Sequence, residues 1–339
     1  MISTRIVTSK DEWESFLKTK PEANFLQSWY WGQFHKALGK EVEPLGFYQN
    51  QKLVGVCLSI VEPARRGKYL TVAGGPIIDF THEELFGAFV DEITKTAKRH
   101  HCVFVRVRPQ IVEDGLAVNL FDTHGFRLAP MHLTADLTSQ LDLSPDEETL
   151  LKNMRKTTRY EIKKAERERI IMKASDDPND IAEFYNLQLA TAQRHGFVPF
   201  SEKFLYEQFK TFVENGAARL YKAYKGQTLL SAAFIIYYGQ EATYHYGAST
   251  QEARKYPGAY LIQWEVIKEA KRRGFKRYNF WGVETLDNIK HRFYGVSVFK
   301  RGFGGYDVQY LHAQDLVIGP IAYLVNLIIE SARRKLRRL

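Results

Sequence analysis

The stretch "ARLYKAYKGQTLLSAAFIIYYGQEATYHYGAS", residues 218–249, decides the fold, because its apolar residues follow the pattern of successive strands. Alternation of apolar and polar side chains predicts three strands, at 218–224, 228–238 and 241–249. The sequence that follows predicts a helix at 259–273 and a strand at 276–281. Successive strands followed by a helix and a further strand indicate a domain that mixes helices and strands.

Helices precede this stretch in the same half of the chain. We expect a basic helix at 145–168, a strand at 169–175, and helices at 178–192 and 202–214. This order of helices, successive strands, a helix and a strand is typical of an N-acyltransferase domain of the acetyltransferase type.

The first half of the chain offers a similar order. Strands are predicted at 44–49, 53–62, 68–78 and 102–108, and helices near 10–18, 28–38 and 82–98. We therefore predict an α/β (α+β) fold of two tandem acetyltransferase (GNAT)-like domains, with mixed sheets flanked by helices. Ser144 and Glu147 form a capping box that begins a helix, and we place the domain boundary there. The predicted parts are a first domain at 1–143, a second at 144–312, and a C-terminal helix at 313–339 that packs back on the first domain.

Charge and cysteine content restrict the class of protein. The 339 residues include 48 Lys and Arg against 39 Asp and Glu, and the net charge of +9 favours an anionic partner such as a phosphate ligand, a nucleic acid or an anionic membrane. Cys57 and Cys102 lie in apolar segments without metal-ligand spacing, so we expect two reduced core thiols. Because the first residues lack the pattern of a signal peptide, we expect a cytoplasmic protein.

The C-terminal segment has two interpretations. The apolar stretch "LVIGPIAYLVNLII" (316–329) is followed by the basic end "ESARRKLRRL" (330–339). The segment is too short to span a bilayer, but its apolar face and basic end suit peripheral contact with a membrane surface. The alternative, which we favour, is a terminal helix that closes a domain core and ends in solvated charge.

The sequence argues against coenzyme A as the acyl donor. In an acetyltransferase-type domain, backbone N–H groups at a helix N-terminus hold the pyrophosphate of the coenzyme. The corresponding stretch here is "ARKYPGAYLIQ" (253–263), in which Pro257 lacks an N–H and the glycine spacing is wrong. We therefore expect a different acyl donor.

Six strings occur in order along the chain: "QSWYWGQF" (27–34), "AGGPIID" (73–79), "RKTTRYEIKKAER" (155–167), "YHYGAS" (244–249), "YPGAYLIQWEVIKEAKRRGFKRYNFWGV" (256–283) and "FKRGFGG" (299–305). Together they resemble the Fem family (FemABX) of peptidoglycan-bridge aminoacyltransferases. Members of this family are cytoplasmic enzymes made of two acetyltransferase-like domains. They move an amino acid from an aminoacyl-tRNA to the stem peptide of a cell-wall precursor.

The resemblance implies a role in peptidoglycan synthesis. The expected partners are aminoacyl-tRNA as the donor and UDP-MurNAc-pentapeptide or lipid II as the acceptor, with no cofactor, no metal and a monomeric enzyme. The resemblance is closest to the short members of the family, because the long heptad insertion that forms a helical hairpin in the larger members is absent here.

The implied reaction is aminolysis of an activated ester. A stem-peptide amine attacks the ester, a tetrahedral oxyanion forms, and the 3′ oxygen of the tRNA leaves, so positioning and oxyanion stabilisation suffice for catalysis. In short members of the family a lysine in an aromatic–lysine pair stabilises the developing charge, and this pair matches Phe299 and Lys300. The alternative is that Lys300 extends from a strand into solvent.

The resemblance also implies residues that bind the acceptor. Two tyrosines on a strand match Tyr244 and Tyr246, and their i, i+2 spacing predicts that both lie on one face of the sheet. Two core tyrosines would show the same pattern. In the family two basic residues contact the diphosphate, and Arg194 is the candidate for the one in the second domain. For the one in the first domain this chain departs from the pattern, because Gln33 stands near the place of the expected lysine, and Lys36 or His35 would have to substitute. Arg108 stands near a position where the family has an acidic residue, and we expect it to contact a carboxylate.

A basic helix offers contacts for tRNA or phosphate. Arg155, Arg159 and Lys163 recur at a spacing of four residues, which places them on one face of the predicted helix. The alternative is a solvated helix face.

Two other functions stay open from the sequence. One is a coenzyme A-dependent N-acyltransferase of the same fold, against which Pro257 argues. The other is a non-catalytic basic protein that binds RNA or a membrane surface, against which the retention of Phe299, Lys300 and the two strand tyrosines argues.

Overall fold

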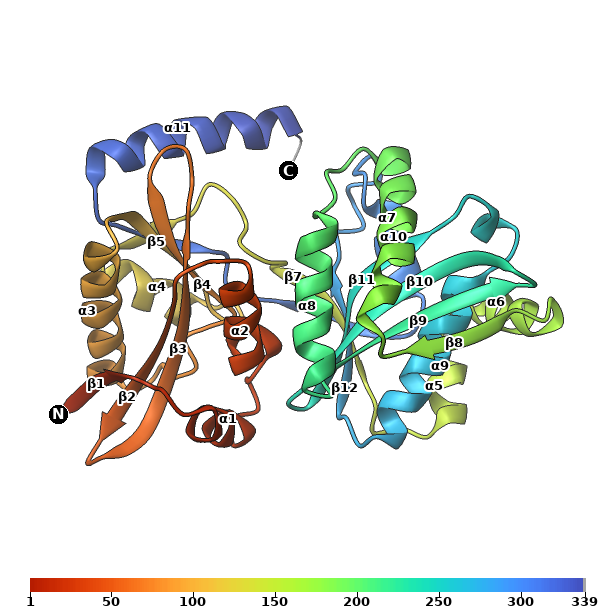
Figure 1. Cartoon of the computed structure of the whole chain (residues 1–339), viewed down its shortest axis with the longest axis horizontal. Helices are drawn as coiled ribbons and strands as arrows, with labels where there is room; N and C mark the ends of the chain where they lie inside the picture. Colours follow the sequence, from red (N-terminus) through yellow and green to blue (C-terminus); the bar gives the residue numbers. More distant parts are fainter. Residues whose placement is uncertain (338–339) are drawn as a thin grey trace. The chain divides into compact units, whose positions relative to one another are not determined.

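The chain divides into two compact units (Figure 1). The computed structural model describes residues 1–337, apart from the side chains of residue 195 and of residues 335–337. The first unit contains Met1–Asp136 and the segment from Gln309 onward, and the second contains Leu137–Val308. The predicted boundary at 143/144 falls one strand too late, because Leu137–Asp142 is a strand that pairs within the second unit.

The first unit is built on a sheet of seven strands among the described residues. Its strands are β1 (Ile2–Ile6), β2 (Val42–Gln49), β3 (Lys52–Glu62), β4 (Lys68–Ala73), β5 (Cys102–Arg108), β6 (Phe126–Leu128) and β14 (Gln314–Val317). They lie in the order β1-β2-β3-β4-β5-β14-β6, and neighbours are antiparallel except for the parallel pair β4 and β5. The predicted C-terminal helix at 313–339 is therefore a strand followed by a helix.

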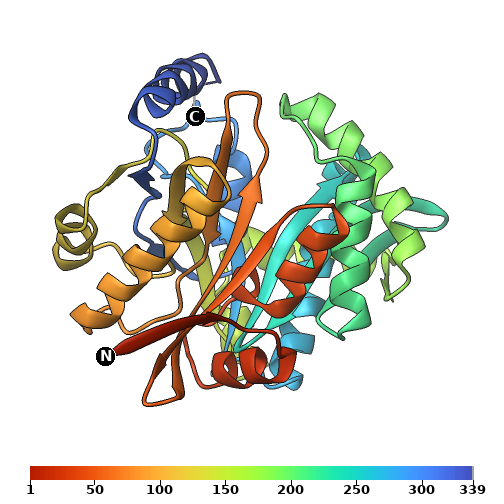
Figure 2. The same cartoon turned by 60° about the vertical axis from the view of Figure 1, so that its left-hand side comes forward.

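The helices of the first unit are α1 (Lys10–Lys18), the 3-10 turn Phe25–Gln27, α2 (Trp29–Ala37), α3 (Glu83–Arg99), α4 (Gly115–Thr123) and α11 (Pro320–Arg337). Figure 2 shows α3 lying across one face of the sheet. Its buried Phe86, Phe89 and Ile93 recur every three to four residues and pack on that face. Cys57 and Cys102 lie buried and free nearby, as predicted.

The second unit repeats this plan. Its strands are β7 (Leu137–Asp142), β8 (Ile171–Ser175), β9 (Ala218–Lys225), β10 (Thr228–Tyr238), β11 (Glu241–Ser249), β12 (Arg277–Gly282) and β13 (Tyr306–Gln309). Their order is β13-β7-β12-β11-β10-β9-β8, again an antiparallel run that ends in one parallel pair, here β11 and β12. The shared strand pattern supports the expected tandem repeat.

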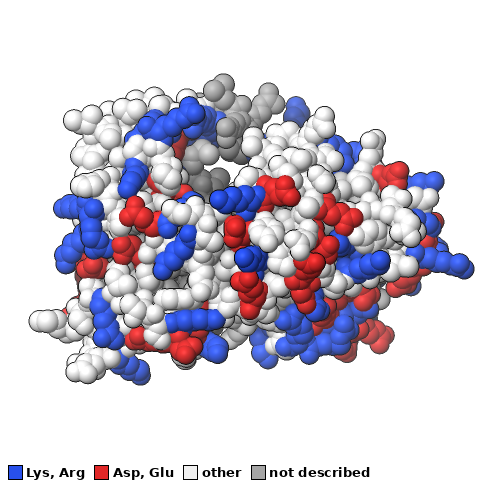
Figure 3. Space-filling view, viewed as in Figure 1, with Lys and Arg blue, Asp and Glu red and all other residues white. Residues whose placement is uncertain are grey.

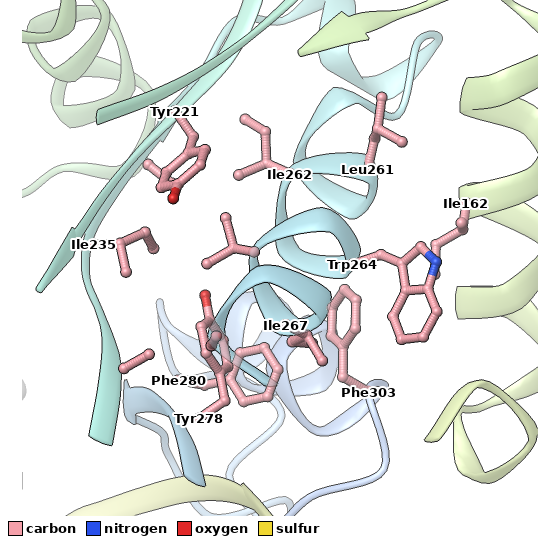
Figure 4. Packing of buried hydrophobic residues seen from close by; sticks show 14 of the residues in the cluster. Ile162, Tyr221, Ile235, Leu261, Ile262, Trp264, Ile267, Tyr278, Phe280 and Phe303 are labelled. Carbon is pink, nitrogen blue, oxygen red and sulfur yellow. The ribbon is translucent and has the colours of Figure 1, made fainter. Parts of the chain in front are cut away.

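The helices of the second unit are α5 (Glu147–Asn153), α6 (Lys156–Arg167), α7 (Ile181–His195), α8 (Glu202–Glu214), α9 (Gly258–Arg272) and α10 (Tyr294–Arg301), with 3-10 turns at Pro178–Asp180 and Glu252–Arg254. Figure 4 shows α9 between Tyr221 and Ile235 of the sheet on one side and Ile162 of α6 on the other. Because α9 is covered on two sides, it buries residues around most of its circumference, including Leu261, Trp264 and Ile267.

The segment that carries Lys300 is a helix and not the strand that its aromatic and valine residues indicate. In α10, Ser297 and Lys300 are buried, and Phe293 and Val296 are exposed. The Oγ of Ser297 donates to the carbonyl oxygen of Phe293 at 2.8 Å. Burial at i and i+3 follows the helical period, so this helix turns two polar side chains inward beside Phe299, which packs on the core.

Candidate active site

Lys300 does not extend into solvent. The residue is 8% exposed, and its Nζ donates a hydrogen bond of 2.7 Å to the carbonyl oxygen of Gly282. Burial lowers the pKa of its amine to about 7. No carboxylate of the described residues forms an ion pair with it. The site therefore holds an amine that is charged in part near neutral pH and has no counter-ion of its own in residues 1–337.

The carbonyl that binds Lys300 stands at the end of β12, where the backbone turns sharply. Trp281 has a φ of 65°, a left-handed conformation that costs a non-glycine residue roughly 1–2 kcal/mol. Asn279 holds this conformation, because its Oδ1 accepts a hydrogen bond of 2.8 Å from the backbone N–H of Trp281. The Nδ2 of Asn279 in turn donates to Glu241 at 3.1 Å. A buried polar network therefore fixes the direction of the Gly282 carbonyl.

The loop after β12 is fastened to α10, the helix of Lys300. The backbone N–H of Glu284 donates to the Oγ of Ser297 at 2.8 Å, and the guanidinium of Arg301 donates to the carbonyl oxygen of Glu284 at 2.7 Å. These two contacts lie on either side of Lys300 in the sequence. They hold the helix and the loop together, so the distance between Lys300 and Gly282 is set by several bonds.

Tyr244 lies on the other side of the lysine. The parallel pairing of β11 with β12 covers Glu241 to Thr243 and stops before Tyr244. The aromatic ring of Tyr244 lies 5.8 Å from the Nζ of Lys300. Its phenol runs along the strand, and a Cβ on Gly247 would lie 1.7 Å from the phenol oxygen. Gly247 thus provides the space for the Tyr244 side chain, and burial raises the pKa of that phenol to about 12.

The prediction that Tyr244 and Tyr246 share one face of the sheet is wrong. On the neighbouring strand β10, Phe234 pairs with Tyr246 and the next residue, Ile235, pairs with Tyr244, so His245 is an extra residue in a β-bulge. Tyr244 packs on the cluster that contains Ile235, and the ring of Tyr246 contacts Phe234 at 5.8 Å. The bulge therefore turns the two phenols to opposite faces, and Tyr244 is the one beside Lys300.

Phe299 supports the helix of Lys300 from the apolar side. Its ring contacts Tyr260 at 4.9 Å and Phe303 at 5.3 Å. The segment after Lys300 is also tied to the start of α6, because the backbone N–H of Arg155 donates to the carbonyl oxygen of Gly302 at 2.9 Å. Phe299 thus packs within the core of the second unit, and it positions the lysine beside it.

The predicted basic helix at 145–168 is two helices, α5 and α6, separated by extended backbone at Met154, and its three candidate residues differ. Lys163 is exposed. Arg155 is exposed, and its Nε donates to Thr157 at 2.7 Å. Arg159 is half-buried and donates to the carbonyl oxygens of Lys152 and Met154, the last of which it approaches closely. Arg159 therefore donates to carbonyl oxygens at the end of α5. Arg155 and Lys163 are exposed and stay available to an anion.

The structure places Arg194 at the end of β11. Its guanidinium donates to the carbonyl oxygen of Ser249 at 2.6 Å, which fixes it near the strand that carries Tyr244. In the first unit, Lys36 is exposed on α2, with its Nζ 5.9 Å from the ring of Trp29. Lys36 is exposed and Arg194 is partly exposed, so solvent reaches both cations. Their contact with a diphosphate stays a prediction.

Arg108 lies in the interior of the first unit, which is a correction to its predicted contact with substrate. The residue is fully buried, and its guanidinium donates to Gln110 and to the carbonyl oxygen of Ala135. It also lies 4.7 Å from the ring of Tyr310. These internal contacts explain an arginine at that position without a substrate carboxylate.

One cluster among the described residues has the chemistry of metal ligands. The Nδ1 atoms of His132 and His312 lie 2.5 and 2.6 Å from the same carboxylate oxygen of Asp136. Ligand atoms of one zinc ion each lie about 2.0–2.1 Å from the metal. Such atoms lie further from one another than the nitrogen and oxygen atoms of this cluster do. Burial opposes ionisation of Asp136, but the hydrogen bonds from both imidazoles hold its pKa at about 2. The cluster is arranged as a hydrogen-bonded set.

The N-terminus of α9, where a coenzyme pyrophosphate would bind, is closed by the protein itself. The backbone N–H of Gly258 donates to the carbonyl oxygen of Tyr256 at 2.8 Å, and Pro257 has none. A Cβ on Gly258 would lie 2.9 Å from Ala223, so this turn packs directly on the sheet. The first turn of α9 therefore offers no cradle of free N–H groups of the kind that coenzyme A requires.

Sequence reasoning found Lys300, Phe299 and Tyr244 but missed three parts of the site. These are the bulge at His245, the strained Trp281 and the carbonyl of Gly282. The backbone conformation of Trp281 and the direction of the Gly282 carbonyl do not depend on a recognisable sequence motif, so only the structure shows their role.

Two sheets with the same strand pattern define a tandem acetyltransferase-like protein, and a buried amine lies at the end of the parallel pair of one of them. The model of the FemAB family matches residues 8–221 and 214–330, so the chain belongs to the FemAB family, and the resemblance seen in the sequence is confirmed. The chain is 22% identical to aminoacyltransferase FemA of Staphylococcus aureus (strain MW2), over 88% of this chain and 92% of that protein.

Solved structures share the fold. The crystal structure of FemX matches with a TM-score of 0.85 and 17% identity, over 95% of this chain and 99% of that chain. A tandem GNAT protein from the clavulanic acid biosynthesis pathway matches with a TM-score of 0.60 and 12% identity, over 94% of this chain and 99% of that chain. The predicted fold of two tandem GNAT-like domains is confirmed.

Proposed function

We propose that this chain is an aminoacyltransferase that moves an amino acid from an aminoacyl-tRNA to the stem peptide of a peptidoglycan precursor. The observation that carries the proposal is the buried amine of Lys300, which lacks a carboxylate partner in the described part of the chain. A buried cation without a counter-ion is costly in the free enzyme and becomes favourable when an anion forms beside it. The oxyanion of an acyl-transfer reaction is such an anion.

The reaction needs no covalent intermediate on the protein. The stem-peptide amine forms a C–N bond to the ester carbonyl carbon, and the π electrons of the carbonyl move to its oxygen. The tetrahedral species then collapses, the C–O bond to the tRNA breaks, and the 3′ oxygen takes up the proton that the amine loses. In this step Lys300 stabilises the oxyanion, Tyr244 holds the acceptor, and Phe299 positions the lysine.

Charge suits both proposed substrates, which are polyanions. The net charge is +9, and Arg155 and Lys163 are exposed on α6 for contact with RNA phosphate. We assign Arg194 and Lys36 to the diphosphate of the acceptor, which is UDP-MurNAc-pentapeptide or lipid II. The family membership and the shared name of the FemA relatives support the amino acid as the group that is moved.

The experiment is a transfer assay with charged total tRNA and each precursor, followed by mass analysis of the product. The expected product is the precursor plus an amino acid residue, and ribonuclease should abolish its formation. Product from free amino acid and ATP after ribonuclease treatment would contradict the proposal. Binding of acetyl-coenzyme A would instead favour the coenzyme-dependent alternative, against which the closed turn at Gly258 argues.

We further propose a monomeric, cytoplasmic enzyme that works in contact with the inner face of the membrane. No helix in residues 1–337 is both long enough and apolar enough to cross a bilayer.

A further inference from the structure

The C-terminal helix α11 packs on the first unit through polar side chains. The phenol of Tyr323 donates to Asp315 at 3.0 Å, and Glu330 accepts from Arg106 at 2.8 Å. Between them, the Oδ1 of Asn326 accepts from the Nε of Arg66 at 3.0 Å. These residues lie at intervals of three and four and so form one face of the helix, which turns inward.

The opposite face of α11 is apolar and open to solvent. Ile321, Leu324, Val325 and Ile328 are 86%, 56%, 48% and 61% exposed. Their positions i, i+3, i+4 and i+7 form one continuous stripe, which we call the α11 stripe. Figure 3 shows mostly uncharged atoms along the upper left edge of the molecule, where Figure 1 places α11. An amphipathic helix that covers a core has the reverse orientation, so closure of the core does not explain this stripe.

Basic residues lie near both ends of the α11 stripe. Arg333 and Arg334 are exposed on the last turns of the helix, and Arg65 is exposed in the β3–β4 turn, beside the arginine that binds Asn326. Arg127 and Leu324 line the same groove at the start of α11. The sequence after Glu330 contains five basic residues and no acidic residue. An apolar stripe with a basic border is complementary to the surface of an anionic bilayer.

We propose that α11 docks this protein on the surface of an anionic lipid bilayer, with the helix parallel to the membrane plane and the α11 stripe among the acyl chains. A second copy of the chain fits the surface less well. It would present the same positive charge again, whereas an anionic bilayer supplies the opposite charge. The proposal concerns binding alone and is tested without the transfer reaction.

The test uses the full chain and flotation with large vesicles, either of phosphatidylcholine or with about a third of phosphatidylglycerol. The parent should float with the anionic vesicles at low salt. Ile321→Gln with Ile328→Gln should lower the partition coefficient by about 10-fold or more, because two branched side chains no longer enter the apolar layer. Arg333→Glu with Arg334→Glu should lower binding to anionic vesicles by a similar factor and leave the weak binding to neutral vesicles unchanged.

A matched control is available in the second unit. Val198 and Ile289 are 86% and 66% exposed, close to the fractions of Ile321 and Ile328, so Val198→Gln with Ile289→Gln replaces two similarly exposed apolar side chains elsewhere. This control should float like the parent. The four side chains that are replaced by Gln are exposed, so both Gln variants should have the same thermal unfolding temperature as the parent. Equal flotation of the parent and the α11 variant, or a parent dimer that only the α11 variant dissociates, would overturn the proposal.

Discussion

The amine of Lys300 and the carbonyl oxygen of Gly282 lie 2.7 Å apart, and this bond joins the last turn of α10 to the end of β12. The bond aims a buried amine along the strand end where the pairing of β11 with β12 has stopped. A neutral carbonyl is a weaker hydrogen-bond acceptor for an ammonium than an anion is. When negative charge develops nearby, the ammonium of Lys300 can therefore donate to the anion in place of, or in addition to, the carbonyl. The geometry thus holds Lys300 in place in the free enzyme without neutralising it.

Lys300→Met should lower turnover by on the order of 10²-fold or more, the usual effect of losing an oxyanion donor. The substitution keeps the apolar packing of the lysine stem but removes the charge. Binding of the acceptor should change little, because the proposed contact forms in the transition state. Single-turnover rates and acceptor binding, measured on the same preparation, check both parts. A folded Lys300→Met protein that transfers at the parent rate would remove Lys300 from the mechanism.

Lys300 should also make stability depend on pH. The pKa of its amine is about 7 in the folded protein and near the ordinary 10.5 when unfolded, so between these values the unfolded chain binds more protons. Stability contributed by this group is therefore present above pH 10.5 and is lost as pH falls towards 7, by up to about 1.4 kcal/mol per pH unit. From pH 7 to pH 9 the parent should gain free energy of unfolding relative to Lys300→Met. Denaturant unfolding of both proteins at the two pH values measures this; a constant difference would contradict the burial argument.

The rate of transfer should bend near pH 7 in the parent. A free acceptor amine becomes more nucleophilic as pH rises, but above pH 7 the charged fraction of Lys300 falls in proportion. The two trends cancel, and the rate should level off. In Lys300→Met the second trend is absent, so the residual rate should keep rising up to the pKa of the acceptor. A parent rate that rises through pH 9 would contradict a charged Lys300 with a pKa near 7 as the active form.

Much of the second unit could be predicted from the sequence because its strands are long and buried. The three strands predicted in residues 218–249 form as β9, β10 and β11 with bounds that agree within one residue, and the helix predicted at 259–273 agrees with α9 within a residue at each end. The apolar residues of α9 include Leu261, Trp264 and Ile267 at helical spacing, which is enough to predict the helix although the structure buries residues around most of it.

The failures have physical causes. Residues 294–301 combine aromatic and valine residues, which favour strands, but burial of Ser297 and Lys300 against the loop after β12 makes them a helix. The bulge at His245 depends on the partner strand β10, which the spacing of the tyrosines does not report. Arg108 looks like a surface residue by charge alone, but the structure supplies internal acceptors for it.

Gly247→Ala should damage the site through Tyr244. The added Cβ would stand 1.7 Å from the phenol oxygen, so the ring has to leave its place beside Lys300, 5.8 Å from the amine. We expect a higher KM for the acceptor and a lower turnover, together on the order of 10-fold or more, as when a positioning contact shifts by about 1 Å. Gly87→Ala in α3 is the matched control, because a Cβ there meets no atom within 4 Å and alanine favours the helix by about 1 kcal/mol. Steady-state kinetics of both variants check the prediction. Equal kinetic constants for Gly247→Ala and the parent would show that Tyr244 has no part in binding the acceptor.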